Sequence, residues 1–224
     1  MDNFPNNLND ENKIFLPLNN RNEECKWLTI GIGDVTNSER LFKMKYPNCA
    51  VYGVEPSSPG NFSNVGKVIP YGIGFNDNDA KISMKVNGTY IEQNFKVLSL
   101  TTVLDKYIHS RFVHYLTIDI EGFEYKILEQ LVGSGNLTEE KTGIVFCQID
   151  AELHNPQMHN AHSAVRNILN PVEFMLNFLQ DSSPFIPIFN APYTHHPHQK
   201  VTFINIENPE CEAAFGFTSF FNHV

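Results

Sequence analysis

The chain has 224 residues, of which 42% are hydrophobic and 18% charged, so its composition indicates one large globular domain rather than a disordered segment. Its net charge of −9 at pH 7 argues against nonspecific binding to nucleic acid, which needs a basic surface. No apolar run approaches the roughly 18–20 residues that a membrane-spanning helix requires.

The first 24 residues are polar and rich in asparagine, without the basic start and apolar stretch of a signal peptide. We therefore expect residues 1–24 to be a loose polar leader and residues 25–224 to form a single domain. For the same reason we expect the chain in the cytoplasm. The secretory pathway stays open as an alternative if an export signal precedes this sequence.

From residue 25 onward, short apolar runs alternate with amphipathic segments. Residues 81–86 and 95–100 should form a hairpin around Asn87-Gly88, which is a strong turn signal. Alternating strands and helices predict an α/β domain with a parallel, doubly wound sheet. The pattern predicts strands over 27–33, 50–56, 67–74, 113–120, 143–150, 185–189 and 200–206, and helices over about 37–46, 102–109, 123–131 and 162–180.

Sheets of this kind bind ligands at the carboxyl ends of their strands. The first predicted strand ends in a glycine turn, Gly31-Ile32-Gly33, which lets a ligand approach the backbone closely. The dinucleotide fingerprint G-x-G-x-x-G is incomplete, because Thr36 occupies its third glycine position. Asp34 and Glu39 would also repel a pyrophosphate. S-adenosylmethionine carries a sulfonium and an ammonium but no phosphate, so it suits this turn better.

The same residues also have structural explanations that need no ligand. The glycines could form an ordinary strand-to-helix turn, and Thr36 with Glu39 could form a capping box that needs no ligand. Glu55 ends the second strand, where an acid can accept both ribose hydroxyls of an adenosine group; the alternative is a solvated loop acid.

Two further strand ends carry acids. Asp119 and Glu121 lie two residues apart and could bind a cation, accept a hydroxyl proton or hold a sulfonium by charge. Asp150, Glu152 and His154 alternate, which fits a metal site, a substrate site with His154 as base, or a polar loop. Residues 195–198, HHPH, fit a surface loop better than a set of ligands. We assign no metal ligand.

Together these segments resemble the FkbM-type methyltransferase domain, in the form found in nematodes, over roughly residues 25–206. The most specific of them is TIDIEGFE, which matches the family signature Asp-x-Glu-Gly-x-Glu. The segments that carry the resemblance are WLTIGIG with Glu39 downstream, YPNCAVYGVEP, VIPYGIG, VLSLTTVLD, HYLTIDIEGFEY, VFCQIDAELHNP and HQKVTFIN.

The resemblance implies a Rossmann-like class I methyltransferase fold, a mostly parallel doubly wound sheet with an antiparallel C-terminal strand. It also implies S-adenosylmethionine as the methyl donor and O-methylation of a small molecule or a sugar hydroxyl. The residues expected to bind the cofactor are Gly31, Gly33, Glu39, Glu55, Asp119 and Glu121.

We predict that Asp119 polarises the acceptor hydroxyl, with His154 as the second candidate. The expected partner is a small-molecule or carbohydrate substrate, with no nucleic acid. Asp34 stands where related sequences often have a further glycine, so a binding module without turnover is one alternative. An NAD-dependent oxidoreductase is a weaker one, because the sequence has neither the third glycine nor a Tyr-x-x-x-Lys pair.

Cys25 and Cys49 each lie two residues before a predicted strand. If these two strands are parallel neighbours, both cysteines lie at adjacent amino-terminal ends, where strands about 4.8 Å apart bring Cα atoms within disulfide range. We expect their Cα atoms within about 7 Å of each other. Two unrelated thiols are the alternative, and they fit a cytoplasmic protein.

Overall fold

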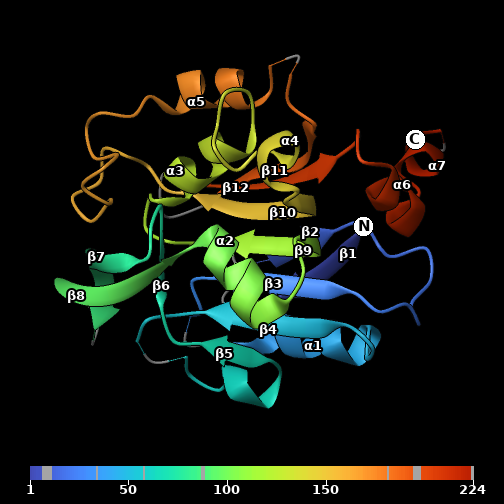
Figure 1. Cartoon of the computed structure of the whole chain (residues 1–224), viewed down its shortest axis with the longest axis horizontal. Helices are drawn as coiled ribbons and strands as arrows, with labels where there is room; N and C mark the ends of the chain where they lie inside the picture. The colour runs from blue at the N-terminus through green and yellow to red at the C-terminus, as the bar shows by residue number, and fades with distance from the viewer. Residues whose placement is uncertain are drawn as a thin grey trace.

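A seven-stranded sheet forms the centre of the computed structural model, which describes residues 1–6, 12–33, 35–57, 59–86, 89–180, 182–193 and 198–222 (Figure 1). The five strands β10, β9, β3, β4 and β5 are parallel, whereas β12 runs antiparallel to both β10 and β11. This confirms the Rossmann-like class I methyltransferase fold with its antiparallel C-terminal strand. The sheet order is β11 (Phe185–Pro192), β12 (Gln199–Asn205), β10 (Val145–Leu153), β9 (Phe112–Ile118), β3 (Lys26–Ile30), β4 (Ala50–Val54) and β5 (Lys67–Ile69).

Helices cover both faces of the sheet, because side chains along each strand alternate between two hydrophobic clusters. In β3, Trp27 packs with Phe42 of α1 (Asn37–Lys45), whereas Leu28 belongs to the cluster on the other face. The first face is also covered by α6 (Pro209–Phe215) and α7 (Phe217–Phe221), and the second by α2 (Leu100–Val103), α3 (Glu124–Leu128) and α5 (Pro171–Phe178).

The N-terminal segment is part of this packing. Strands β1 (Asp2–Pro5) and β2 (Asn12–Phe15) form an antiparallel hairpin, and the rings of Phe4 and Phe15 pack against Trp27. The backbone N–H of Leu16 donates to the side chain of Gln148 on β10 at 2.7 Å. The expected loose leader over residues 1–24 is therefore wrong, because buried aromatic rings and backbone hydrogen bonds join the hairpin to the domain.

Residues 67–74 do not form the single strand that we expected. Pro70 has no N–H to donate, so the run divides into β5 and β6 (Gly72–Gly74). Strand β6 belongs to a second, three-stranded sheet with the hairpin of β7 (Asn78–Val86) and β8 (Thr89–Ser99). The hairpin is confirmed, although Asn87 and Gly88 lie outside the described residues. In Figure 1 this sheet lies on the side to which the arrow of β10 points.

A proline also shortens the helix that we expected over residues 162–180. The helix α5 begins only at Pro171, and the side chain of Asn170 caps it by accepting from the N–H groups of Val172 and Glu173. The remaining helical segments are α4 (Glu139–Thr142), a π turn (Leu104–Ile108) and two 3-10 turns (Phe62–Asn64 and Glu129–Leu131). Within the described part of the chain, no helix has the length and apolar character needed to cross a membrane.

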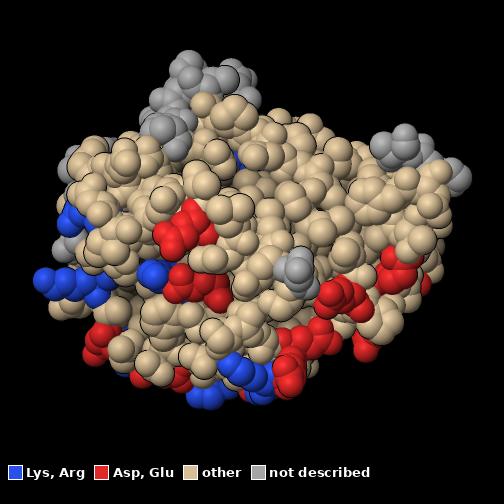
Figure 2. Space-filling view, turned by 90° about the horizontal axis from the view of Figure 1, so that it is seen from above, with Lys and Arg blue, Asp and Glu red and all other residues tan. Residues whose placement is uncertain are grey.

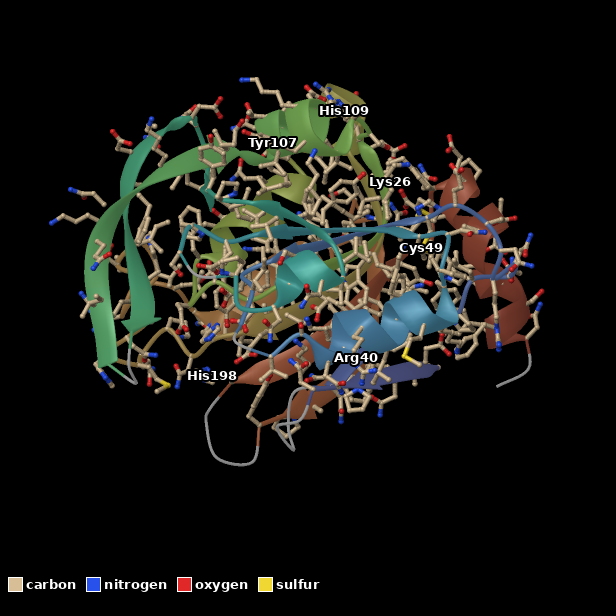
Figure 3. The ribbon with its side chains drawn as sticks, turned by 90° about the horizontal axis from the view of Figure 1, so that it is seen from below. Lys26, Arg40, Cys49, Tyr107, His109 and His198 are labelled. Atoms are coloured by element: carbon tan, nitrogen blue, oxygen red, sulfur yellow. A yellow bond between two sulfur atoms is a disulfide. The ribbon has the colours of Figure 1, made fainter. Side chains whose placement is uncertain are left out.

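All four cysteines are paired. Cys25 bonds to Cys49, with 4.3 Å between their Cα atoms, and Cys147 of β10 bonds to Cys211 of α6. The predicted closeness of Cys25 and Cys49 is confirmed, because Lys26 and Ala50, the residues that follow them, pair in register. The alternative of two unrelated thiols is wrong. Figure 3 shows Cys49 and His198 toward opposite ends of the molecule.

Candidate functional site at the carboxyl edge of the sheet

The two glycines of the turn after β3 have different surroundings. Gly31 has φ +86°, and a Cβ at this position would collide with the carbonyl oxygen of Asp119. Its N–H donates to the carbonyl of Val54 at 3.0 Å, so Gly31 lets the ends of three strands meet. A Cβ at Gly33 would have nothing within 4 Å. The turn therefore leaves open space at Gly33. Asp34 lies outside the described residues.

Glu55 lies directly beside this turn. Its side chain accepts hydrogen bonds from the backbone N–H of Ile32 at 3.3 Å and from the N–H and hydroxyl of Ser57 at 3.0 and 2.7 Å. The residue is only 8% exposed, so it is not a solvated loop acid. A buried carboxylate is thus held in place next to the open space at Gly33.

Glu39 contacts a different part of the molecule. It is buried and forms an ion pair with Lys13 of the N-terminal hairpin. It also accepts a hydrogen bond from the hydroxyl of Thr29 at 3.3 Å. Thr36 makes no side-chain capping bond, so the capping box does not form either. These contacts give Glu39 a structural role in attaching the hairpin to the sheet.

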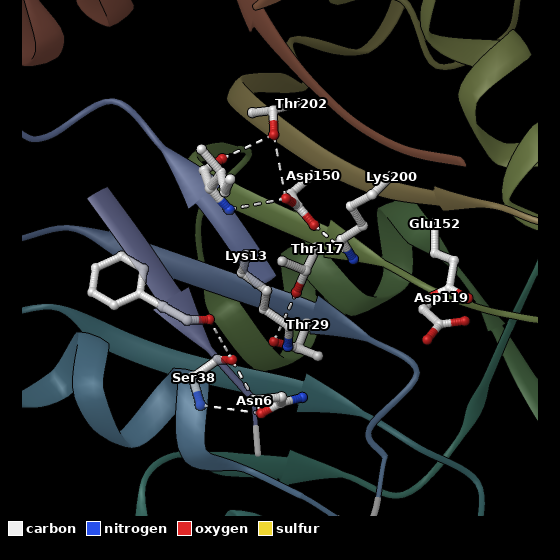
Figure 4. Close-up of polar contacts among 12 residues, drawn as sticks. Asn6, Lys13, Thr29, Ser38, Thr117, Asp119, Asp150, Glu152, Lys200 and Thr202 are labelled. Carbon is white, nitrogen blue, oxygen red and sulfur yellow. Dashed lines mark hydrogen bonds and ion pairs between the residues drawn. The ribbon is translucent and has the colours of Figure 1, made fainter. Parts of the chain in front are cut away.

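Three carboxylates from two strand ends surround one imidazole nitrogen. The Nε2 atom of His154, which follows β10, lies 3.6 Å from Asp119 Oδ1, 3.5 Å from Glu121 Oε2 and 3.7 Å from Glu152 Oε1. We call Asp119, Glu121, Glu152 and His154 the His154 cluster. Figure 4 shows Asp119 and Glu152 on the same side of the sheet as Lys200. The structure therefore brings together the two residues that we predicted to be catalytic.

Glu124, which we did not predict, holds the imidazole of His154. Its side chain is fully buried, and Oε1 accepts from the backbone N–H of His154 at 2.8 Å and lies 3.1 Å from Nδ1 of its ring. Its Oε2 accepts from the N–H of Gly122 at 2.8 Å. Glu124 is the last acid of TIDIEGFE, so the signature itself contained the signal.

His198 also belongs at this edge, although we expected a surface loop over residues 195–198. Strand β12 pairs antiparallel with β10, and Gln199 lies opposite Leu153, so His198 arrives beside His154 with 4.5 Å between the ring centroids. It is 7% exposed, and its Nδ1 accepts from the N–H of Asn155 at 3.0 Å. Residues 195–197 lie outside the described residues.

Asp150 has a structural role. Its carboxylate forms an ion pair with Lys200 at 2.8 Å and accepts from the N–H of Ile14 at 3.1 Å and the hydroxyl of Thr202 at 3.3 Å (Figure 4). Burial alone would lower the pKa of Lys200, but the charges of Asp150 and Glu152 outweigh burial and raise it. Lys200 therefore places a fixed positive charge behind the His154 cluster.

A comparison that covers most of the sequence shows the family of this chain. A model of the family described as "Methyltransferase FkbM domain" matches residues 3–179. The chain belongs to this family. The match to the FkbM domain includes the N-terminal hairpin, the glycine turn, Glu55 and the whole His154 cluster, whereas His198 lies beyond it.

Similarity to individual known proteins is weak. No curated protein matches the chain. A solved structure titled "Crystal structure of fibrillarin/Nop5p complex" is 12% identical, with a TM-score of 0.43 over 80% of this chain and 72% of that one.

The charges in the FkbM domain shift the pKa values of the cluster in opposite directions. Burial lowers the pKa of His154, but the carboxylates around it, Glu124 first, outweigh burial and raise the pKa. Burial raises the pKa of Glu152, but Lys200 and His154 lower it overall. Desolvation and repulsion from Glu152 raise the pKa of Asp119. Because the Asp119 side chain is still 44% exposed, repulsion matters more than desolvation here.

Proposed function

We propose that this FkbM domain transfers a methyl group from S-adenosylmethionine to a hydroxyl oxygen of a small molecule or sugar. The observation that carries the proposal is the open space at Gly33, which has the fixed carboxylate of Glu55 on one side and the His154 cluster along the same edge. This open space leaves room for a bound methyl donor beside the backbone at Gly33.

Three parts of S-adenosylmethionine have candidate partners on this edge. Glu55 would accept hydrogen bonds from the two ribose hydroxyls, and the space at Gly33 would hold the methionine end. Asp119 and Glu121 would place negative charge near the sulfonium. When bound, the donor supplies a methyl group activated by the positive sulfur and leaves as S-adenosylhomocysteine.

Asp119 is our first candidate for the group that receives the acceptor proton. Asp119 would accept the proton that the acceptor hydroxyl loses as its oxygen takes the methyl group from the donor. A general base is most effective when its pKa lies near the working pH, and the raised pKa of Asp119 moves it toward neutral pH. His154 lies 3.6 Å from Asp119 and is the second candidate.

The charge of the chain bears on the class of acceptor. Figure 2 shows acidic and basic side chains interspersed on one face, with the basic ones gathered in no continuous patch among the described residues of that face. With a net charge of −9, the protein would repel polyanions at long range. This favours a neutral or cationic small molecule or sugar as the acceptor.

We propose further that the protein works in the secretory pathway or outside the cell, rather than in the cytoplasm. Two disulfides pair all four cysteines, and disulfides persist mainly in oxidising compartments. Peptide mapping of native protein alkylated without reduction tests this. Linked peptides containing Cys25 and Cys49 are expected, whereas alkylated thiols at both positions would restore the cytoplasmic assignment.

Calorimetric titration with S-adenosylmethionine, S-adenosylhomocysteine and NAD tests the function. We expect saturable binding of the first two and none of NAD. Binding of NAD alone would overturn the proposal in favour of an oxidoreductase. Binding of S-adenosylmethionine, without methylated product from any member of a panel of sugars and small alcohols, would point to a binding module.

A further inference from the structure

We propose that the His154 cluster, together with His198, binds one divalent transition-metal ion, with Glu152, His154 and His198 as ligands and Asp119 and Glu121 next to them. Binding rests on the geometry of these side chains alone. Only its use in catalysis, where the ion would bind the acceptor hydroxyl and make its proton more acidic, rests on the proposed function.

The distances in the cluster fit a shared ion better than they fit hydrogen bonds. The three carboxylate oxygens lie 3.5–3.7 Å from Nε2 of His154, whereas hydrogen bonds of this type measure about 2.7–3.2 Å. Two ligand atoms that share a tetrahedral ion at about 2.1 Å lie about 3.4 Å apart. Each of these oxygens therefore lies at a distance from Nε2 that two ligands of one ion would have.

The imidazole of His154 is oriented as a metal ligand would be. Metal-binding histidines usually donate the N–H of the other ring nitrogen to a carboxylate. Here Nδ1 lies 3.1 Å from the fully buried carboxylate of Glu124, and the His154 side chain is only 6% exposed. With Nδ1–H donated, the lone pair of Nε2 is directed at three carboxylates, an arrangement that a cation would stabilise.

A second histidine adds to the site. Ligand atoms of Glu152, His154 and His198 lie within 4.8 Å of one another, and all three residues are buried. Because Nδ1 of His198 accepts from the N–H of Asn155, its neutral ring carries the proton on Nε2. To bind an ion, His198 must therefore give up that hydrogen bond or lose the proton on Nε2.

The donors indicate the kind of ion. Imidazole nitrogen suits zinc, iron and cobalt, whereas magnesium and calcium prefer oxygen ligands throughout. Two imidazoles with one carboxylate match a catalytic site that keeps a position open for substrate. The competing occupant is a proton on His154, which would satisfy the carboxylates without any metal.

Cobalt titration of chelator-treated, full-length protein tests the proposal. We expect saturation at one Co²⁺ per chain, with visible absorption bands typical of nitrogen and oxygen ligands, and displacement by Zn²⁺ but not by Mg²⁺. The matched variants are His154→Gln in the cluster and His109→Asn, an exposed histidine that lies far from His198 in Figure 3. His154→Gln should weaken Co²⁺ binding at least tenfold, and His109→Asn should leave it unchanged.

Absence of saturable binding, or equal binding by the parent and His154→Gln, would overturn the proposal and leave a proton as the occupant. If His154→Gln fails to fold, Asp119→Asn replaces it, because this side chain is 44% exposed and should also weaken binding. Titration of metal-free protein with S-adenosylhomocysteine separates the two claims. Binding of that ligand without Co²⁺ binding refutes only the metal site, and the reverse result refutes only the proposed function.

Discussion

At the scale of single residues, the two glycines of the turn should respond differently to substitution. Gly33→Val should leave thermal stability unchanged and abolish binding of S-adenosylhomocysteine, because the new side chain enters open space. Gly31→Ala should destabilise the fold instead, because its Cβ would collide with the carbonyl of Asp119 and its φ is +86°. Thermal unfolding and ligand titration of both variants measure this. Equal ligand affinity in Gly33→Val and the parent would make the turn purely structural.

Glu55 should contribute to affinity through its charge. Glu55→Gln keeps the size of the side chain but removes the charge of the group that would accept hydrogen bonds from both ribose hydroxyls. We expect adenosine-containing ligands to bind about 1–3 kcal/mol more weakly, the scale of a hydrogen bond to a charged group. The dissociation constant of S-adenosylhomocysteine is the measurement. An unchanged value would place Glu55 outside the site.

His114 should make stability depend on pH. Burial, and then the charge of Lys26, lowers its pKa to about 4, and its Nδ1 accepts from the N–H of Lys26 at 3.3 Å. The unfolded chain binds this proton near pH 6.5, so the contribution to stability is complete above pH 6.5 and is lost as the pH falls toward 4. The loss is about 3 kcal/mol at most.

The variant His114→Gln isolates this effect, because it keeps a hydrogen-bond acceptor but cannot titrate. Urea denaturation at several pH values should show a shallower loss of stability in His114→Gln than in the parent between pH 6.5 and 4. Parallel curves for the two proteins would show that His114 does not titrate as described.

The predicted strand ends place some of the site residues correctly but not others. Glu55, Asp119, Glu121 and His154 could be predicted to lie at one edge, because parallel strands align their carboxyl ends. Glu39 could not be placed, since its partner Lys13 lies 26 residues earlier in a segment that reads as polar loop. The nearness of His198 depends on the register between β10 and β12, which the sequence does not reveal.

At the scale of elements, the Lys13–Glu39 ion pair should fasten the N-terminal hairpin to the sheet. Lys13→Met would leave Glu39, which is 2% exposed, without its cation. We expect a loss of about 3–5 kcal/mol in the free energy of unfolding. The double variant Lys13→Met with Glu39→Met should recover most of it, because no charge is then left unpaired.

Denaturant unfolding with a surface pair as control tests this. The pair Lys126–Glu129 is partly exposed, at 28% and 37%, so Lys126→Met should change stability by only about 0–1 kcal/mol. A similarly small effect of Lys13→Met would show that the hairpin is attached by its apolar contacts alone.

The boundaries of helices and strands depend on local residues such as proline as well as on apolar spacing. Helix α1 was predicted almost to the residue, because its apolar spacing is clear. Pro70 ends a strand that the apolar pattern extends to residue 74, and Pro171 starts a helix that the pattern begins at residue 162. The N-terminal hairpin was not predicted, although the apolar run Ile14-Phe15-Leu16 indicates its second strand.

At the scale of the whole molecule, the disulfides should account for a large share of stability. In the chain-entropy model, bridges spanning 24 and 64 residues each stabilise by about 3–5 kcal/mol. Replacing Cys147 and Cys211 together by Ala should therefore lower the midpoint of thermal unfolding by several degrees or more. Adding reductant should lower the midpoint of the parent further than that of the variant. A midpoint that reductant does not alter would mean that the bridges are absent.

The overall architecture was predictable, because alternating strands and helices leave few arrangements for a parallel sheet. The parallel neighbours β3 and β4, and with them the Cys25–Cys49 contact, followed from that architecture. The bridge from Cys147 to Cys211 could not be predicted from the architecture, since it depends on how α6 packs after the last strand.

The central claim is that the carboxyl edge of the sheet binds S-adenosylmethionine between Gly33, Glu55 and the His154 cluster. A crystal structure of the protein with S-adenosylhomocysteine tests it most directly. Our account predicts both ribose hydroxyls within hydrogen-bonding distance of Glu55, the methionine end over Gly33 and the sulfur facing Asp119. A ligand bound elsewhere, or no bound ligand at saturating concentration, would contradict it.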